Sequence, residues 1–387
     1  MVSQAIGKVF KVARMFGPQC RTLQRGLLGD PESRSPEYCP YSEFQLSQVS
    51  NWSKAAQTLA HLLIPASSQR PPRWVRHRPR LKPVVRLLLR PTKVFRYHDT
   101  HCWPDPTPDQ AWFFLNGIGA DRHVLLLNAA YLGKLFGRPL ILLHNASCGL
   151  LADLAECTVD RGSRGIAEAA RKAFAPIYVA LKQPSCKRVI LIAHSQGTVV
   201  TSVLLWLLRA LYPATAAQAL NGEPGCPEQQ VAQHLAHQWG FPSADEAARR
   251  GEQRGSAAVR PPLSAHELAK LEIYTFGNCA SGMSAIDKHR SLPFIESFGN
   301  EHDPLARLGV LASDTGHSFA PIGGERYLRP QAWGHLLNAH YLHPLERDRQ
   351  DRVAGLARLV GLPGNRLQGP RLLEYLQGQT PPALSTA

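Results

Sequence analysis

Short apolar runs recur through the second part of the chain and predict the strands of a sheet. They lie at 111–116, 139–145, 188–193, 271–276, 294–298 and 325–328. Each run has the length of a strand and is rich in aliphatic, β-branched or aromatic residues. Several are apolar throughout, a pattern typical of strands that are buried on both faces.

Stretches with apolar residues at helical spacing separate these runs, at 123–136, 165–181 and 196–212. Asp121 is placed where a helix N-cap is needed, and Gly137 where the same helix should end. Strands that alternate with helices predict an α/β fold with a mostly parallel sheet covered on both faces.

Two further segments flank or interrupt this pattern. Residues 213–268 are dominated by Ala, Gln, Gly, Pro and charged residues, and we expect an insertion there that partly covers a site. The body of the protein is predicted to span residues 99–345, and residues 346–387 are predicted to form a C-terminal helical tail.

The first residues show a different periodicity. In residues 2–16 the apolar side chains fall on one side of a helix, and Lys8, Lys11 and Arg14 fall opposite. Acidic residues are absent before Asp30. This pattern fits a helix on an anionic membrane surface or a mitochondrial-type targeting segment. A helix that docks on the protein's own body remains an alternative.

Charge separates the two parts of the chain. The 387 residues include 44 Lys and Arg against 29 Asp and Glu, a net charge of +15. Residues 1–98 carry +13 of this excess, with a Pro- and Arg-rich stretch at 70–96, and the remainder carries +2. We therefore predict a basic N-terminal extension, 1–98, that contacts anionic lipid through residues 1–26 and 70–96. Nucleic acid is disfavoured because no recognition motif is present, and a solvated basic linker stays an alternative.

Composition excludes other classes. The longest apolar stretch, 199–212, is shorter than the roughly 20 residues that a membrane-spanning helix needs. A secretory signal is disfavoured because no long apolar core follows the basic start. The eight cysteines form no CxxC pair, and His98, His101 and Cys102 lack a second pair of ligands. We expect neither a metal nor a cofactor.

The main chemical motif lies between the strand at 188–193 and the helix that begins at 196. It reads Ala193, His194, Ser195, Gln196 and Gly197. A strand, a small residue two before Ser, a Gly two after it and a helix form a nucleophile elbow, which lifts the Ser hydroxyl above the sheet. Small residues are required because the strand and helix backbones approach closely there.

The motif resembles the α/β-hydrolase superfamily, and in particular the Ala-x-Ser-x-Gly elbow of some lipases. The resemblance covers about residues 111–343 and implies the order nucleophile, acid, histidine. Asn116, Gly117, Ile118 and Asp121, with the segments 300–303 and 334–338, also resemble uncharacterised lipase-like hydrolases.

The resemblance implies the remaining site residues. Asp303 follows the penultimate strand and is the expected acid, with Glu301 and Asp287 as alternatives. His335 follows a glycine before an apolar helix and is the expected base, ahead of His340; the other downstream candidates are His317 and His343.

Oxyanion stabilisation is expected from the backbone amides of Gln196 and Ile118, the latter in the loop that contains Gly117.

These observations predict a serine hydrolase that cleaves carboxylic esters, with lipid esters as the expected substrates. Ser195 would attack, His335 would act as base and then acid, and Asp303 would orient the imidazole. One alternative is a catalytically silent relative that acts as a binding or scaffold protein through its basic arm. Another is an acyltransferase, which fold resemblance alone does not separate from a hydrolase.

Overall fold

The computed structural model describes residues 18–34, 38–63, 93–97, 109–117, 120–144, 164–212, 262–312, 322–350, 359–367 and 369–384. Several predictions from the sequence lie outside these residues. They are the amphipathic helix at 2–16, most of the basic stretch at 70–96, most of the insertion at 213–268, and Ile118, His317, His98, His101 and Cys102.

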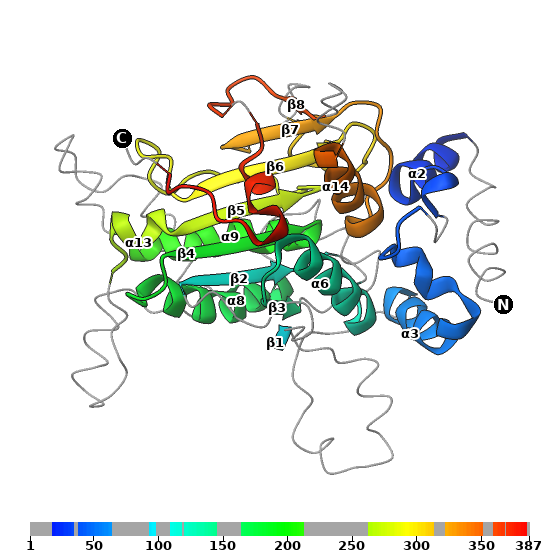
Figure 1. Cartoon of the computed structure of the whole chain (residues 1–387), viewed down its shortest axis with the longest axis horizontal. Coiled ribbons are helices and arrows are strands. Elements are labelled where there is room, and N and C mark those ends of the chain that lie inside the picture. The colour runs from blue at the N-terminus through cyan, green and yellow to red at the C-terminus, as the bar shows by residue number, and fades with distance from the viewer. Residues whose placement is uncertain are drawn as a thin grey trace, which may run out of the picture.

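One eight-stranded sheet organises the described residues, in the order β1-β3-β2-β4-β5-β6-β7-β8 (Figure 1). The strands are β1 (Lys93–Tyr97), β2 (Gln110–Leu115), β3 (Leu140–His144), β4 (Arg188–His194), β5 (Leu271–Phe276), β6 (Phe294–Asn300), β7 (Glu325–Arg329) and β8 (Val360–Gly361). The central pairings are parallel, whereas β1 with β3 and β7 with β8 are antiparallel. The mostly parallel sheet predicted from the sequence is confirmed.

Alternate residues of the central strands enter two separate cores. Phe113, Leu191 and Ile273 pack on one face, against helices α8 (Arg164–Lys182) and α9 (Gln196–Leu211). Phe114, Ile192 and Tyr274 pack on the other face, against α6 (Arg122–Phe136) and the 3₁₀ segment η9 (Arg371–Gly378). Figure 1 shows α8 and α9 behind the sheet and α6 in front of it. Burial on both faces explains why these strands are apolar throughout.

Local signals set the bounds of α6. The Asp121 carboxylate accepts hydrogen bonds from the amides of His123 and Val124, at 2.9 and 3.0 Å. Gly137 ends the helix at φ 61°, a left-handed conformation that costs glycine little. Both ends therefore lie where the sequence predicts them.

An N-terminal segment, residues 18–34 and 38–63, packs beside the sheet. It contains α2 (Pro18–Leu28), η1 (Glu32–Arg34), η2 (Glu43–Ser47), η3 (Val49–Asn51) and α3 (Trp52–Leu63). Elements of this segment contact α6 and the π-helix η7 (Leu337–Leu342). Figure 1 shows α2 and α3 at the same end of the molecule as helix α14 (His343–Gln350).

Two segments differ from the sequence expectation. Strand β1 belongs to the stretch predicted as an extension, yet it forms an edge of the sheet against β3. Its few alternating residues, partly exposed, give a weak strand signal within a basic stretch. The predicted helical tail, 346–387, contains the end of α14, strand β8 and η9, and β8 pairs with β7 at the other edge.

Two shorter helices complete the described body, α13 (Ala265–Ala269) and η5 (Ala306–Leu308). The strand order, the two helical layers and the strand-turn-helix connection from β4 to α9 are those of the α/β-hydrolase fold. Within the part of the chain that the structure describes, no helix combines the length and apolar character needed to cross a membrane.

Candidate active site

Ser195 lies in the sharp turn between β4 and α9. Its backbone has φ 54° and ψ −127°, an uncommon conformation for a residue with a side chain, and its amide donates to the Phe276 carbonyl at 3.0 Å. A Cβ at Gly197 would lie 2.6 Å from the Leu115 carbonyl oxygen. Glycine is therefore required at Gly197, because α9 starts directly against β2. This geometry is that of the nucleophile elbow.

Asp303 and His335 meet at the carboxyl end of the sheet. Asp303 follows β6, and His335 lies in the loop after β7, residues 330–336, called here the His335 loop. The imidazole Nδ1 is 2.6 Å from Asp303 Oδ2. The Leu305 amide donates to Asp303 Oδ1 at 2.8 Å, and the Tyr341 hydroxyl donates to Oδ2. The carboxylate is fully buried and is held by three donors.

The surroundings of Asp303 keep it ionised. Burial by itself would raise the pKa of this carboxyl, but the electrostatic attraction of the His335 imidazole and the hydrogen bonds from His335, Tyr341 and Leu305 lower it below its ordinary value. An ionised carboxylate accepts a proton donor, so His335 carries its proton on Nδ1. The Nε2 atom is then an acceptor.

Two reactive atoms in this region have no hydrogen-bond partner among the described residues. They are Ser195 Oγ and His335 Nε2, and both are buried. Buried polar atoms are nearly always satisfied in folded proteins, so such exceptions call for an explanation. A hydroxyl and a basic nitrogen left available in one region are the groups that nucleophilic catalysis uses.

Gly277, after β5, makes room for the acid and histidine pair. A Cβ at this position would lie 2.7 Å from His335 Cε1 and 3.0 Å from Asp303 Oδ2, and the residue has φ 53°. Any larger residue would meet the imidazole. No motif in the sequence points to Gly277, because only the fold brings the end of β5 against the His335 loop.

The loop after β2 lies against the nucleophile. A Cβ at Gly117 would lie 2.6 Å from Ser195 Cβ, so the Gly117 backbone is in close contact with the elbow. Gln196 is the first residue of α9, where backbone amides point out of the helix end. Ile118 lies outside the described residues, and its expected amide contribution stays a prediction.

The alternative histidines have other partners. His340 Nδ1 accepts from the Leu336 amide at 3.0 Å, and its Nε2 lies 3.1 Å from Ser33 Oγ. Burial lowers the pKa of His340 to about 3, so the ring is neutral. His343 Nδ1 instead lies 3.3 Å from the Tyr131 hydroxyl.

The alternative acids are also engaged elsewhere. Asp287 accepts from the Tyr212 hydroxyl at 2.9 Å and from the Arg290 amide at 3.1 Å. Glu301 accepts from the Gln331 amide at 2.6 Å. Among the acids and histidines that the sequence offers, the described structure shows a hydrogen bond between Asp303 and His335.

His194, predicted only as part of the elbow, supports the neighbouring loop. Its Nε2 donates to the His335 carbonyl oxygen at 2.8 Å. Burial first, and then the nearby His335, lower the pKa of His194 to about 3, so it is neutral. This contact and that of Tyr341 with Asp303 join residues distant in sequence, and no motif in the sequence signals them.

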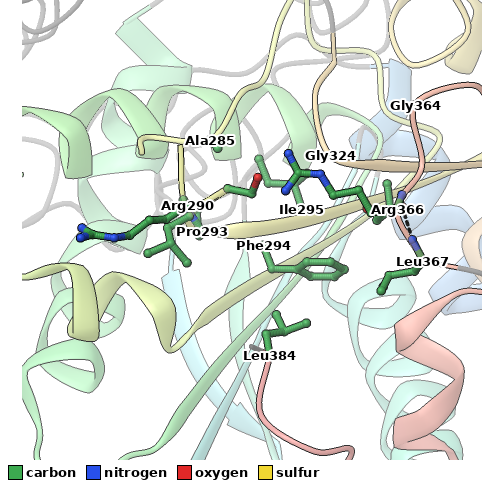
Figure 2. Close-up of a pocket in the computed structure, with 13 residues that line it drawn as sticks. Ala285, Arg290, Pro293, Phe294, Ile295, Gly324, Gly364, Arg366, Leu367 and Leu384 are labelled. Atoms are coloured by element: carbon green, nitrogen blue, oxygen red, sulfur yellow. Dashed lines mark hydrogen bonds between the residues drawn. The ribbon is translucent and has the colours of Figure 1, made fainter. Parts of the chain in front are cut away.

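The described residues contain no group of three or more His, Cys, Asp or Glu side chains arranged to hold a metal. A cavity of about 380 Å³ lies at the amino ends of β6 and β7, whereas Ser195 lies at the carboxyl end of β4. Figure 2 shows Phe294, Arg366 and Leu384 around it and Arg290 pointing away. This cavity is separate from the candidate site.

Comparisons with known proteins give distant structural similarity only. No family model matches the chain, and no curated protein matches it. One similar solved structure is proline iminopeptidase from Mycobacterium smegmatis, with 13% identity, a TM-score of 0.27, and coverage of 68% of this chain and 92% of that one. Another is esterase B from Lactobacillus rhamnosis, solved with a tributyrin phosphonate inhibitor, with 11% identity, a TM-score of 0.31, and coverage of 84% and 99%. The fold assignment above rests on the strand order and not on these scores.

Proposed function

We propose that the protein is a serine hydrolase that cleaves carboxylic esters through an acyl-serine intermediate. In this proposal Ser195 is the nucleophile, and His335 is the general base and then the general acid. Asp303 orients the imidazole and stabilises the positive charge that it acquires during the reaction. The amides of Gln196 and Ile118 stabilise the oxyanion.

In the proposed reaction, His335 Nε2 accepts and returns each proton. Ser195 Oγ attacks the ester carbonyl carbon while His335 Nε2 takes the hydroxyl proton. The resulting imidazolium passes that proton to the leaving alcohol as the carbon–oxygen bond of the ester breaks. Water then attacks the acyl-serine, again losing a proton to Nε2, and the proton returns to Ser195 Oγ as the acid product leaves.

One observation carries the proposal. His335 Nδ1 is committed to the Asp303 carboxylate at 2.6 Å, while Nε2 and Ser195 Oγ are both buried and have no other partner among the residues described. A histidine with only a structural role would have its second nitrogen satisfied, as His340 does. The strained φ of Ser195 supports the same reading, because strain of this kind concentrates at functional sites.

Lipid esters are the proposed substrate class. The support comes from the sequence, where the basic amphipathic start at 2–16 suits an anionic membrane surface and the segment 213–268 suits a cover over an apolar acyl site. Attachment is tested with residues 1–17 deleted, because α2 begins at Pro18. We expect the deletion to weaken binding to phosphatidylglycerol vesicles, with the basic stretch at 70–96 retaining part of it, and to leave hydrolysis of p-nitrophenyl acetate intact. Unchanged vesicle binding would remove this segment as the anchor.

A fluorophosphonate probe tests the assignment. Wild-type protein should form a covalent adduct, and Ser195→Ala should form none. Ser202→Ala is the matched control, because Ser202 is also buried in α9 but its hydroxyl already donates to the Val199 carbonyl at 2.8 Å. This variant should react like wild type. A wild-type protein that stays unlabelled, or a Ser195→Ala variant that labels equally, would contradict the proposal and favour a silent binding protein.

A further inference from the structure

Helix α2 contacts the backbone of the proposed base directly. The amide of His335 donates to the Leu27 carbonyl oxygen at 2.9 Å. Leu27 lies in the last turn of α2, where carbonyl groups have no partner within the helix. Among the described residues, the N-terminal segment thus supplies the hydrogen bond to the His335 amide, and His194 supplies one to the His335 carbonyl.

Arg25 and Gly26, at the end of α2, also pack against the loops of the site. The Arg25 guanidinium lies over the Trp333 ring, 4.2 Å from its centroid, and Trp333 stacks on His302. Gly26 packs so tightly that a Cβ would lie 2.9 Å from both the His302 carbonyl oxygen and Pro304 Cδ. The end of α2 therefore touches both loops of the site, the one that carries Asp303 and the one that carries His335.

A second anchor runs through His340. Its Nδ1 accepts from the Leu336 amide, the residue directly after His335, so its proton is on Nε2. That Nε2–H donates to Ser33 Oγ at 3.1 Å, and Ser33 donates to the Asp30 carbonyl at 2.7 Å. The chain of hydrogen bonds joins the N-terminal segment to the residue next to the base.

A third anchor holds the helix that follows. The amides of Asn338 and Ala339, at the start of η7, donate to the Glu43 carboxylate at 2.8 and 3.2 Å. The Asn338 side chain also donates to the Tyr41 carbonyl at 2.7 Å. The cap residue of η7 itself, Leu336, has no side chain that could satisfy these amides. Because Tyr341 of η7 donates to Asp303, a shift of η7 would move both members of the pair.

We propose that residues 25–34 and 41–43 are part of the active-site scaffold, and that Ser33 and Glu43 are positioning residues that hold His335 in its productive place. The inference rests on the proposed function, since it assigns the segment a role in the reaction of Ser195. Neither residue belongs to the elbow or to the pair of Asp303 and His335. Their effect passes through the backbone of residues 335–339, and small displacements of a catalytic base cost large factors in rate.

The test compares Glu43→Ala, Glu43→Gln and Ser33→Ala with wild type. Glu32→Ala is the control, because it removes an exposed carboxylate from the same segment. For p-nitrophenyl acetate we expect kcat to fall about 10-fold to 10²-fold in Glu43→Ala, with KM little changed. The melting temperature should fall by a few degrees, because the Asn338 and Ala339 amides lose their acceptor. Glu43→Gln, which retains an acceptor, should recover part of the loss, and Ser33→Ala should show a smaller loss.

A second readout does not depend on activity. The proton between His335 Nδ1 and Asp303 should give a far-downfield ¹H NMR resonance in wild type, and Glu43→Ala should shift or broaden it while Glu32→Ala leaves it in place. The positioning role would be overturned if wild type is active and both Glu43→Ala and Ser33→Ala keep its kcat and its resonance. If Glu43→Ala does not fold, Glu43→Gln and Ser33→Ala decide. Wild-type protein that fails to react with a fluorophosphonate would instead refute the proposed function, and the resonance would still report on positioning.

Discussion

Two buried clusters, each built around carboxyl groups from or next to β5 and β6, lie at opposite ends of these strands. At the carboxyl end, Asp303 joins His335 and Tyr341. Towards the amino end, Glu272 of β5 accepts from the Arg371 guanidinium at 3.0 and 3.2 Å and from the hydroxyls of Tyr274 and Tyr375 at 2.6 and 2.9 Å. Glu296 of β6 beside it accepts from the amides of Arg371 and Leu372, at 2.8 and 3.2 Å.

The two clusters differ in whether their buried polar atoms all have hydrogen-bond partners. No side chain of the Glu272 and Glu296 cluster appears among the buried, unpartnered polar atoms of the described residues, whereas Ser195 Oγ and His335 Nε2 both do. The amino-end cluster therefore holds η9 against the sheet, and its buried side chains have their hydrogen-bond partners within the cluster. The carboxyl-end cluster orients an imidazole and leaves its second nitrogen available. Similar groups serve structure in one place and, by our proposal, chemistry in the other.

The largest effect is expected from Asp303→Asn. The amide can accept from Leu305, but its NH₂ group faces His335 Nδ1 and favours the tautomer with the proton on Nε2, which cannot act as a base. We expect kcat for p-nitrophenyl acetate to fall on the order of 10⁴-fold. Circular dichroism should show a retained fold, which would separate this cluster from the structural one. A loss below about tenfold would contradict the role of Asp303.

Glu272→Ala should act on stability and not on chemistry. It leaves the buried Arg371 guanidinium and two tyrosine hydroxyls without their acceptor, and breaking a buried ion pair typically costs about 3–5 kcal/mol. We expect that loss in the free energy of urea unfolding, with kcat of the folded fraction unchanged. Lys134→Ala removes a half-exposed pair with Glu346, 3.6 Å apart, and should cost under about 1 kcal/mol. Equal costs for the two variants would mean that the amino-end cluster has no special structural weight.

Gly117→Ala tests the contact between the loop after β2 and the elbow. The added methyl would lie 2.6 Å from Ser195 Cβ and would displace the loop that we expect to hold an oxyanion donor. We expect kcat to fall about 10²-fold, the usual effect of losing one such donor. The control is Gly323→Ala, where the nearest atom to the new methyl is 3.5 Å away. Kinetics that match this control would show that the loop does not take part.

Glu296 and Asp303 should also differ in their pH dependence. Burial raises the pKa of Glu296 from its ordinary 4.5 to about 8, so the folded state holds the proton more tightly than the unfolded chain. Its contribution to stability is complete below about pH 4.5 and is lost as the pH rises towards about 8. Asp303, whose pKa is lowered, behaves in the opposite way and loses its contribution as the pH falls below about 4.

Urea unfolding of wild type and Glu296→Gln measures the pH-dependent contribution of Glu296 to the free energy of unfolding. The difference between the two free energies should change between about pH 5 and pH 8, in the direction that weakens wild type as the pH rises. A constant difference across that range would contradict the assignment of the shift to Glu296.

The sequence predicts features that depend on neighbours in the chain. The strand, turn and helix around Ser195 and the cap at Asp121 are local, and both are found where the pattern indicates. Strand β1 was missed because an exposed edge strand carries only a short alternating pattern. The π-helix at 337–342 was also missed, since its apolar spacing resembles that of an ordinary α-helix.

Contacts between distant segments explain the remaining gaps. The sequence ranks His335 above His340 by resemblance alone, whereas the structure separates them by their partners, Asp303 for one and Ser33 for the other. The bond between His335 and Leu27 joins residues more than 300 positions apart, and no pattern in the sequence encodes it. The charge distribution predicted a basic extension over residues 1–98, but residues 18–34 and 38–63 pack beside the sheet, because net charge does not report packing.

The central claim is that Ser195 is acylated during turnover, and acid quenching of the reaction with p-nitrophenyl acetate tests it most directly. Peptide mass spectrometry of protein quenched in the first turnover should find one acetyl group, on the peptide and side chain of Ser195. The same peptide from Asp303→Asn should remain unmodified over that time. Turnover of the ester by wild type with no acetyl group on Ser195, or with the acetyl group on another residue, would contradict the account.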